Sequence, residues 1–368
     1  MAKRFNGDAL YNAAQRLPNG GPRMSALMEA IRQADAAEDH YWRMLLRYDY
    51  ACQAIFHDDP PKAMPAAAEF NRIFDEHSDA LYAASQDGAP EMHLMITQIG
   101  IDPIVNLPQI PMEQWEDLMK EFRALVQKYH EGLRTYWSQM CQFWQYVDRD
   151  QAYTYFQKFW KTGRDGLSDC RACERSLAVR ICLLAGKRNE ADEYAKPMEQ
   201  GRIWFCNDTP QRYWLAYLED ALDHREHERA RVFANKLFRK ADRDWNDLSY
   251  LGAIIHAWSK SGDDLGRALH LALKRLGWTA GMWDQKKLYD YYKGCYVCFR
   301  ELAGKEPAIQ PDPQTGEVIP KLFPLYNKEG VYDTRELAEW FYGQSQQIAA
   351  AFDKRNGSDY FSRDLALA

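Results

Sequence analysis

Three cysteines in the middle of the chain have the residue type and spacing of a metal or thiol-redox site. Cys170 and Cys173 form a Cys-x-x-Cys pair, and Cys206 follows later in the chain. Three thiolates can hold Zn²⁺ when a fourth ligand completes a tetrahedron, and Asp169 or a histidine could supply it. The pair also begins a predicted helix, and a helix N-terminus lowers the pKa of a thiol, as redox-active pairs require. Structural zinc and thiol-redox chemistry are therefore both open for Cys170, Cys173 and Cys206.

The same cysteines also fit an interpretation without chemistry, in which they pack in the core. Cys170 and Cys173 continue into Leu177, Ile181 and Leu184 at steps of three and four residues, which places all five on one face of a helix. A buried cysteine behaves as a small hydrophobic residue. We favour this packing interpretation, with no cofactor, and keep a structural zinc ion as the alternative.

The helices that carry these cysteines belong to a repeating pattern. Four alanines, Ala152, Ala191, Ala230 and Ala268, are separated by 39, 39 and 38 residues. A large apolar residue stands three positions after each of them, namely Tyr155, Tyr194, Phe233 and Leu271. A fixed period with a small residue at one helical position indicates stacked helical hairpins. The small residue lets two helices approach closely, and its neighbour fills the adjoining groove.

This period predicts an all-α fold, an α-solenoid of tetratricopeptide-like helical hairpins. Gly186, His224 and Gly262 lie five or six residues before three of the alanines and are the expected turns. We expect N-terminal helical hairpins over residues 1–110, the repeat array over 111–277, and C-terminal helices over 278–368. A proline-rich insertion at 304–333 should interrupt the last segment, with a turn at 314–316 and a loose tail from Asn356.

Composition narrows the class of protein further. The chain has 368 residues, 46% of them hydrophobic, and a net charge of −6, which argues against a dedicated nucleic-acid binder. No stretch approaches the roughly 18 uncharged apolar residues of a membrane span. The opening MAKRFNGDALYNAAQ lacks the apolar core of a signal peptide. We therefore expect a cytoplasmic protein with reduced thiols and no membrane partner.

One stretch of sequence resembles a known group of proteins. Asp169-Cys170-x-x-Cys173 is followed by Gly186-x4-Ala191, by Ala195-x-Pro197, and by Cys206 ahead of Pro210. This order is similar to that in a group of uncharacterised bacterial tetratricopeptide-repeat proteins, and the likeness extends over roughly residues 24 to 276. Gln211 departs from the group, which has a histidine after the proline. The resemblance implies an all-helical repeat protein and no established reaction.

Further candidate residues point to binding rather than catalysis. Tetratricopeptide-like arrays use the first helix of each pair to line a groove, and aromatic residues there make partner contacts. The residues of this kind are Tyr213, Trp214, Tyr217, Tyr250 and Trp258, some of which must be core. No phosphate-binding, dinucleotide-binding or serine-nucleophile motif is present. An active site assembled from scattered residues would leave no such motif, so this absence favours a non-enzymatic role without establishing it.

Three other features have unremarkable interpretations. Cys295-x-x-Cys298 falls on an apolar stripe and should be core, because repeats contact mainly their neighbours and would not bring it to Cys170. His256 is expected to be a satisfied, semi-buried histidine rather than a base. One helix is basic and could contact nucleic acid, but we favour a solvated face balanced by acidic residues elsewhere, and do not expect nucleic acid as a partner. Its basic residues are Arg225, Arg229, Arg231, Lys236, Arg239, Lys240 and Arg243. We thus predict a protein- or peptide-binding scaffold of the bacterial cytoplasm, an adaptor, regulator or immunity-type partner.

Overall fold

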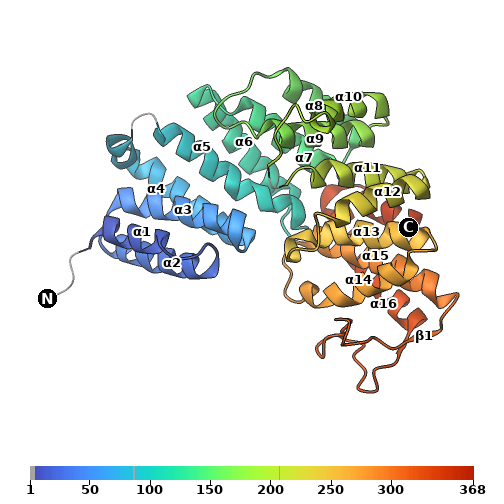
Figure 1. Ribbon diagram of the computed structural model, residues 1–368. Coiled ribbons are helices and arrows are strands. Elements are labelled where there is room, and N and C mark those ends of the chain that lie inside the picture. Colours follow the sequence, from blue (N-terminus) through green and yellow to red (C-terminus); the bar gives the residue numbers. More distant parts are fainter. Residues whose placement is uncertain (1–4, 86–87, 207) are drawn as a thin grey trace. The chain divides into compact units, whose positions relative to one another are not determined.

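The computed structural model describes residues 5–85, 88–206 and 208–368, and this part of the chain is almost entirely helical. It contains seventeen α-helices and two strands of two residues each (Figure 1). The prediction of an all-α protein is therefore confirmed. None of the described helices combines the length and apolar character needed to cross a bilayer.

The chain divides into two compact units. The first comprises Met1–Val105, Ile110–Gln139 and Phe159–Ser168, and the second comprises Asn106–Gln109, Met140–Lys158 and Asp169–Ala368. Helices α7 (Leu133–Trp144) and α8 (Arg149–Lys161) pass from one unit to the other. The boundary expected near residue 277 lies inside the second unit.

The first unit is a series of helices that pack on their neighbours in sequence. They are α1 (Gly7–Gln15), α2 (Gly21–Ala36), α3 (His40–His57), the 3₁₀ turn η1 (Pro60–Lys62), α4 (Ala63–Ala84), α5 (Gly88–Ile101), the 3₁₀ turn η2 (Asp102–Asn106), which ends in the second unit, and α6 (Met112–Tyr129). Contacts join α2 to α3, α3 to α4 and α4 to α5. Their shared core includes Phe70, Ile73 and Phe74, which are at most 2% exposed. Asp39 begins α3 by accepting the Trp42 N–H at 3.2 Å, which satisfies a free helix-end donor.

The second unit continues with helices in pairs. They are α9 (Arg171–Leu184), α10 (Arg188–Glu199), α11 (Gln211–Asp223), α12 (His227–Phe238), α13 (Leu248–Lys260), α14 (Leu265–Arg275), α15 (Gln285–Ala303), α16 (Thr334–Asn356) and α17 (Tyr360–Leu367), with 3₁₀ turns η3 (Trp245–Asp247) and η4 (Leu276–Thr279). The members of each pair touch, and α9 also contacts α11, α11 contacts α13, and α13 contacts α15. The first helix of each pair thus lies against the first helix of the next.

The alanines that revealed the period occupy equivalent places in the structure. Each is the fourth residue of its helix, in α8, α10, α12 and α14, and each is at most 1% exposed. The turns before α10 and α14 contain Gly186 and Gly262, both with φ of +71°. In the turn before α12, His224 is the C-cap of α11, and the next residue, Arg225, has the positive φ, of +58°. His224 and Arg225 both lie in the turn between α11 and α12, as the prediction of a turn at His224 requires.

Two glycines bring α13 and α15 into very close contact. A Cβ atom on Gly252 would lie 2.2 Å from the Asp290 carbonyl oxygen, and one on Gly294 would lie 2.2 Å from the Gly252 carbonyl oxygen. Only residues without a side chain allow backbones to approach this closely. The contact fixes how α15 lies on α13, and therefore which of their side chains face the same space.

The C-terminal region departs from expectation at its end. The insertion is closed by strands β1 (Ala308–Ile309) and β2 (Tyr332–Asp333), which pair antiparallel, and Gly316 turns with φ of +88°, as the prediction of a turn at 314–316 requires. The tail after Asn356 was expected to be loose, and this is wrong. It forms α17, because the Phe361 ring is fully buried and stacks on Phe352 at 4.4 Å between centroids.

Candidate functional site

The three predicted cysteines lie together in the second unit. Cys170 is the N-cap of α9, and its Sγ accepts the Cys173 N–H at 3.3 Å. Cys206 lies in the loop before α11, where the Thr209 hydroxyl accepts its N–H at 3.1 Å. The three Sγ atoms all lie within 4.8 Å of one another, and those of Cys173 and Cys206 are 3.2 Å apart. We call these three residues the thiol cluster; its cysteines are free thiols.

The environment of the thiol cluster differs from that of packed cysteines. Cys170 is exposed, and Cys173 and Cys206 are half-buried. Of the apolar stripe expected to carry them, Ile181 is buried while Leu177 and Leu184 are only half-buried. The buried face of α9 instead includes Ala178, Val179, Cys182 and Leu183. Cys170 does not pack in the core as expected, because it is exposed at the N-terminal end of α9, whereas Cys173 is half-buried.

Cys173 and Cys206 differ in how readily they lose a proton. Burial raises the pKa of Cys173, and hydrogen bonding to Cys206 raises it further against the lowering effect of Arg212. Burial also acts to raise the pKa of Cys206, but hydrogen bonds from Thr209 and Cys173 outweigh it, so that this pKa is lowered. Cys206 is thus the thiol of this pair that ionises more readily, and the other sulfur stabilises it as a donor.

The second cysteine pair has the opposite surroundings. Cys295 and Cys298 are fully buried in the middle of α15 and belong to the large core of the unit. Burial raises the pKa of Cys298 to about 12. Within the described part of the chain, no fourth metal-binding side chain lies close enough to join the thiol cluster. This holds for Asp169 and for the cysteines of α15.

The aromatic residues expected to line a groove are divided between core and surface. Tyr213, Tyr217 and Trp258 are at most 3% exposed and pack inside the unit. Trp214 and Tyr250 are half-buried. Any direct partner contact by this set would therefore come from Trp214 and Tyr250, and their role in binding stays a prediction.

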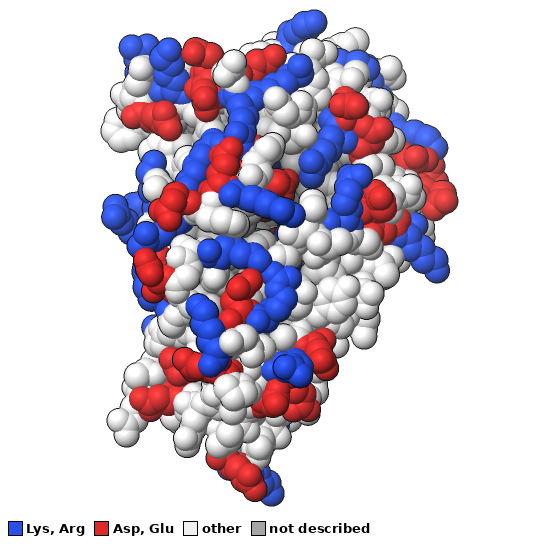
Figure 2. Space-filling model, turned by 90° about the vertical axis from the view of Figure 1, so that its right-hand side faces the viewer, with Lys and Arg blue, Asp and Glu red and all other residues white. Residues whose placement is uncertain are grey.

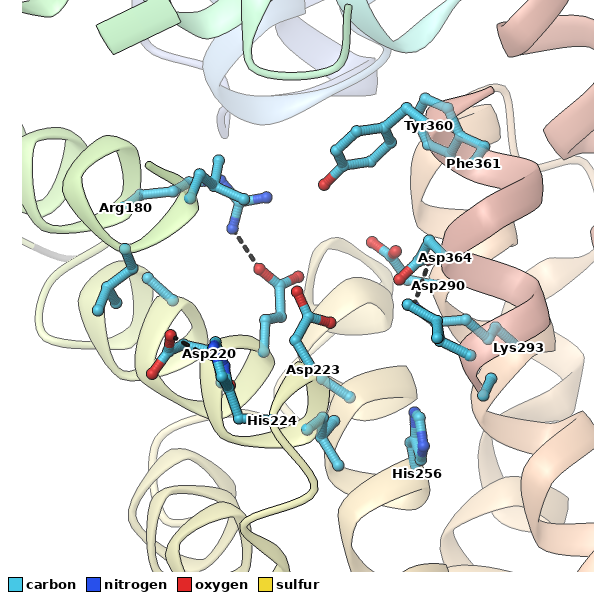
Figure 3. A pocket seen from close by; sticks show the side chains of 18 of the residues that line it. Arg180, Asp220, Asp223, His224, His256, Asp290, Lys293, Tyr360, Phe361 and Asp364 are labelled. Carbon is cyan, nitrogen blue, oxygen red and sulfur yellow. Dashed lines mark hydrogen bonds and ion pairs between the residues drawn. The ribbon is translucent and has the colours of Figure 1, made fainter. Parts of the chain in front are cut away.

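The second unit also contains a pocket that the sequence did not indicate. It has a volume of about 220 Å³ and is lined by α9, α11, α13, α15 and α17 together with the start of α8. We call it the charged pocket. Figure 3 shows its labelled side chains on facing helices, with Arg180 and Asp223 on one side and Lys293 and Asp364 on the other. Its charged members are Arg149, Arg180, Glu219, Asp220, Asp223, Lys286, Asp290, Lys293 and Asp364.

Most charges in the pocket are paired across it or along a helix. Arg180 of α9 forms an ion pair with Glu219 of α11. Lys286 contacts Asp290 at 2.7 Å one turn along α15. Two further contacts reach Asp364, the Lys293 ion pair at 2.6 Å and the Tyr289 hydroxyl at 2.5 Å. These last contacts attach α17 to α15.

The paired groups keep their charges in spite of their burial. Burial raises the pKa of Glu219, but Arg180 and the lysines of α15 outweigh it, and the pKa is lowered. The same balance, with Lys293 as the chief cation, lowers the pKa of Asp364. A carboxylate beside a fixed cation stays ionised because the attraction exceeds the cost of desolvation.

Two groups in the pocket behave differently from the pairs. The side chain of Asp223 is 36% exposed and forms an ion pair with Arg149 at 3.9 Å; partial burial and the charge of Asp364 raise its pKa against the lowering effect of Lys293. His256 is 8% exposed, and burial together with Lys293 and Lys260 lowers its pKa to about 3. It is therefore a neutral imidazole at neutral pH. His256 was expected to be semi-buried, whereas it is buried in the pocket wall.

The sequence matches no protein-family model and no curated protein at a significant level. The resemblance to bacterial tetratricopeptide-repeat proteins therefore stays a prediction.

Charges elsewhere on the unit are locally balanced. In the basic helix region Arg229 pairs with Asp220 at 3.1 Å and Arg231 pairs with Asp264 at 2.7 Å. Basic and acidic side chains are interspersed on the face drawn in Figure 2. A nucleic-acid surface usually gathers basic charge along one face. The interpretation of the basic helix as a solvated face fits these pairs.

The residues that sequence reasoning missed come from distant parts of the chain. Lys286, Asp290 and Lys293 follow one another along α15 at helical spacing, a pattern that usually belongs to an exposed face. Asp364 lies in the segment that was expected to be loose. The available signal was the apolar pair of Tyr360-Phe361 with Leu365, since a short stripe of this kind needs a surface to cover.

Proposed function

We propose that the second unit is a non-enzymatic protein- or peptide-binding scaffold, built as an α-solenoid of tetratricopeptide-like hairpins. Two features support the solenoid arrangement. The four marker alanines have equivalent buried positions, and the first helix of each pair contacts the first helix of the next. Stacked hairpins produce both features, because each repeat buries its apolar face against its neighbours.

The observation that best supports the proposal is which helices form the charged pocket. Four successive first helices, α9, α11, α13 and α15, each contribute side chains to it. In a repeat array this face is the one on which a partner is bound. An adaptor, a regulator and an immunity-type protein would each use such a face.

The size of the pocket favours a side chain of a partner over a cofactor. Its volume of about 220 Å³ is below the roughly 300–1,000 Å³ of pockets that enclose small-molecule ligands. One long side chain, projecting from a peptide that lies across the helices, fits a space of this size. Charged side chains in the pocket wall would orient the side chain of the partner.

The charge of the pocket indicates which side chain it would accept. Burial and the like charge of Asp364 raise the pKa of Asp223, and the ion pair of Asp223 with Arg149 is longer, at 3.9 Å, than that of Asp364 with Lys293, at 2.6 Å. A lysine or arginine of the partner placed beside Asp223 would relieve this repulsion. We therefore expect a partner segment that presents a basic side chain to Asp223.

A peptide-display selection on the purified protein, followed by fluorescence polarisation, tests this function. The selection should enrich peptides with a conserved lysine or arginine. Asp223→Asn should weaken their binding about tenfold, because the basic side chain of the peptide would lose its charge partner in the pocket. Asp263→Asn, at an exposed position in the turn before α14, is the matched control and should bind like the wild type.

Two outcomes would contradict the scaffold. One is a selection that enriches no peptide family, combined with a hydrolase activity in the pure protein. The other is equal weakening by Asp223→Asn and Asp263→Asn, which would place the binding surface away from the charged pocket.

The alternative function is a zinc or thiol-redox protein that uses Cys170, Cys173 and Cys206. It is compatible with a scaffold because the two sites occupy different parts of α9. Cys173 and Arg180 are seven residues apart, or about 10 Å along a helix that rises 1.5 Å per residue. Occupation of one site would therefore leave room for the other.

A further inference from the structure

The thiol cluster is held by hydrogen bonds at two places in the chain. Cys170 and Cys173 are fixed by the start of α9, where the Cys170 sulfur caps the helix. Cys206 is held by Thr209, whose N–H donates to the Cys206 carbonyl at 3.2 Å and whose hydroxyl accepts the Cys206 N–H at 3.1 Å. Thr209 is 3% exposed, so this contact is anchored in the unit. The three sulfur atoms therefore meet because the backbone brings them together.

The spacing of the sulfur atoms fits coordination of one ion. Zinc–sulfur bonds are about 2.3 Å long, and a tetrahedral angle then separates two sulfur ligands by about 3.8 Å. The Sγ–Sγ separations in the cluster run from 3.2 Å for Cys173 and Cys206 up to at most 4.8 Å. Small side-chain rotations would bring all three to a common centre.

We propose that Cys170, Cys173 and Cys206 form a binding site for a single Zn²⁺ ion, held by three thiolates with its fourth position open to solvent. The exposure of Cys170 leaves one side of the cluster accessible to water. No fourth histidine, cysteine or carboxylate joins the group within the described part of the chain. A water molecule would then complete the tetrahedron, as in zinc sites that keep an exchangeable ligand.

The surroundings favour a site with this charge. Three thiolates around Zn²⁺ carry one net negative charge, which the N-terminus of a helix stabilises. α9 has fourteen residues and begins at the cluster. The Arg212 guanidinium acts on Cys173 as a positive charge and is itself held by Asp208 at 2.9 Å. Both contributions are lacking around Cys295 and Cys298, which lie inside a helix and inside the core.

Cobalt substitution tests the site directly on the full-length protein. Reduced, metal-free protein is titrated with Co²⁺ under argon and then with Zn²⁺. We expect a thiolate-to-cobalt charge-transfer band and tetrahedral d–d bands that saturate at one equivalent and disappear when Zn²⁺ is added. Cys173→Ser and Cys206→Ser should each remove most of the charge-transfer intensity and weaken Zn²⁺ binding at least about tenfold. Cys52→Ser, at a half-buried thiol of the first unit, should leave both unchanged.

Several outcomes would overturn the zinc site. They are the absence of a charge-transfer band at one equivalent, a band unaltered in Cys173→Ser and Cys206→Ser, and binding of Cu⁺ without binding of Zn²⁺. A further one is a Cys173–Cys206 disulfide in the isolated protein together with no metal uptake after reduction, which would make the cluster a redox pair. Circular dichroism of each variant separates loss of the site from loss of the fold. A variant that does not fold is replaced by the Ala substitution at the same position.

Discussion

The charged pocket and the thiol cluster lie in the same unit, and the structure holds them in different ways. The pocket is made by side chains from helices far apart in the chain, and nearly all its charges are already paired. The cluster is made by the start of α9 and the residue Cys206, and its three sulfur atoms lie within 4.8 Å of one another. Removing a pocket charge should therefore disturb the packing of several helices, whereas removing a thiol should disturb a local site. Charged side chains can thus hold helices together, while the thiols depend on a backbone that the fold has already positioned.

Breaking the ion pair between α15 and α17 should produce the largest effect. Lys293 and Asp364 have side chains only 17% and 22% exposed, and Lys293→Met would leave Asp364 with the Tyr289 hydroxyl as its close partner. Loss of one member of a buried pair leaves a charge uncompensated and should cost about 3 kcal/mol of unfolding free energy. Urea unfolding at pH 7 measures this loss.

Cys170→Ser is the matched variant in the thiol cluster. Cys170 is exposed, so its replacement should change the unfolding free energy by less than about 0.5 kcal/mol in metal-free protein. Similar losses for Lys293→Met and Cys170→Ser would contradict the view that the pocket supports the fold and the cluster does not.

Enlarging an alanine at the repeat interface should have an intermediate effect. Ala234 is fully buried on α12, and Ala234→Leu would push helices apart at a cost of about 1–3 kcal/mol. Hydrogen exchange should show the damage spreading to α11 and α13, because adjoining repeats stabilise each other. Ala350→Leu, at an exposed position of α16, is the control. Equal and negligible losses at both positions would mean that the period of 38–39 residues is accidental.

Lowering the pH should reduce the free energy of unfolding by a smaller amount, through protonation of His256. Its pKa in the folded protein is lowered to about 3, while the unfolded chain takes up this proton near pH 6.5. The contribution to stability is therefore complete above pH 6.5 and is lost as the pH falls towards 3. Between pH 7 and pH 6 the loss should be about 0.7 kcal/mol.

The difference between wild type and His256→Gln, each unfolded in urea at both pH values, isolates this contribution. Cys206→Ser should retain the full pH dependence of the wild type, because no histidine belongs to the cluster. A pH dependence that is the same in His256→Gln and wild type would show that another group is responsible.

The sequence allowed prediction of the helices, because they depend on local patterns, and the four alanines of the period lie at the fourth position of α8, α10, α12 and α14. Core packing was the favoured interpretation of Cys170 and Cys173, whereas the structure brings their sulfur atoms close to that of Cys206. The turn predicted at His224 is present, but the positive φ of its neighbour Arg225 could not be predicted, because a charged residue gives no sign of it. Glycine gives that sign at Gly186 and Gly262.

The charged pocket could not be predicted for a physical reason. An ion pair such as that of Lys286 and Asp290 has the same spacing in sequence whether it is exposed or enclosed. Its burial is decided by α17, and that helix was taken for a loose tail because its apolar stripe is short. A helix of eight residues is marginal in isolation, so its existence depends on Phe361 finding a surface in the core.

The close contact of Gly252 with α15 means that the shape of the charged pocket can change while its lining side chains stay the same. Gly252 precedes His256 by one turn, and the carbonyl of Asp290 lies directly against it. A single methyl group at Gly252 would change the angle or distance between two pocket walls while every lining residue stayed the same. A substitution at Gly252 could thus alter which side chain the pocket admits, by changing how α13 crosses α15 and without changing any lining residue.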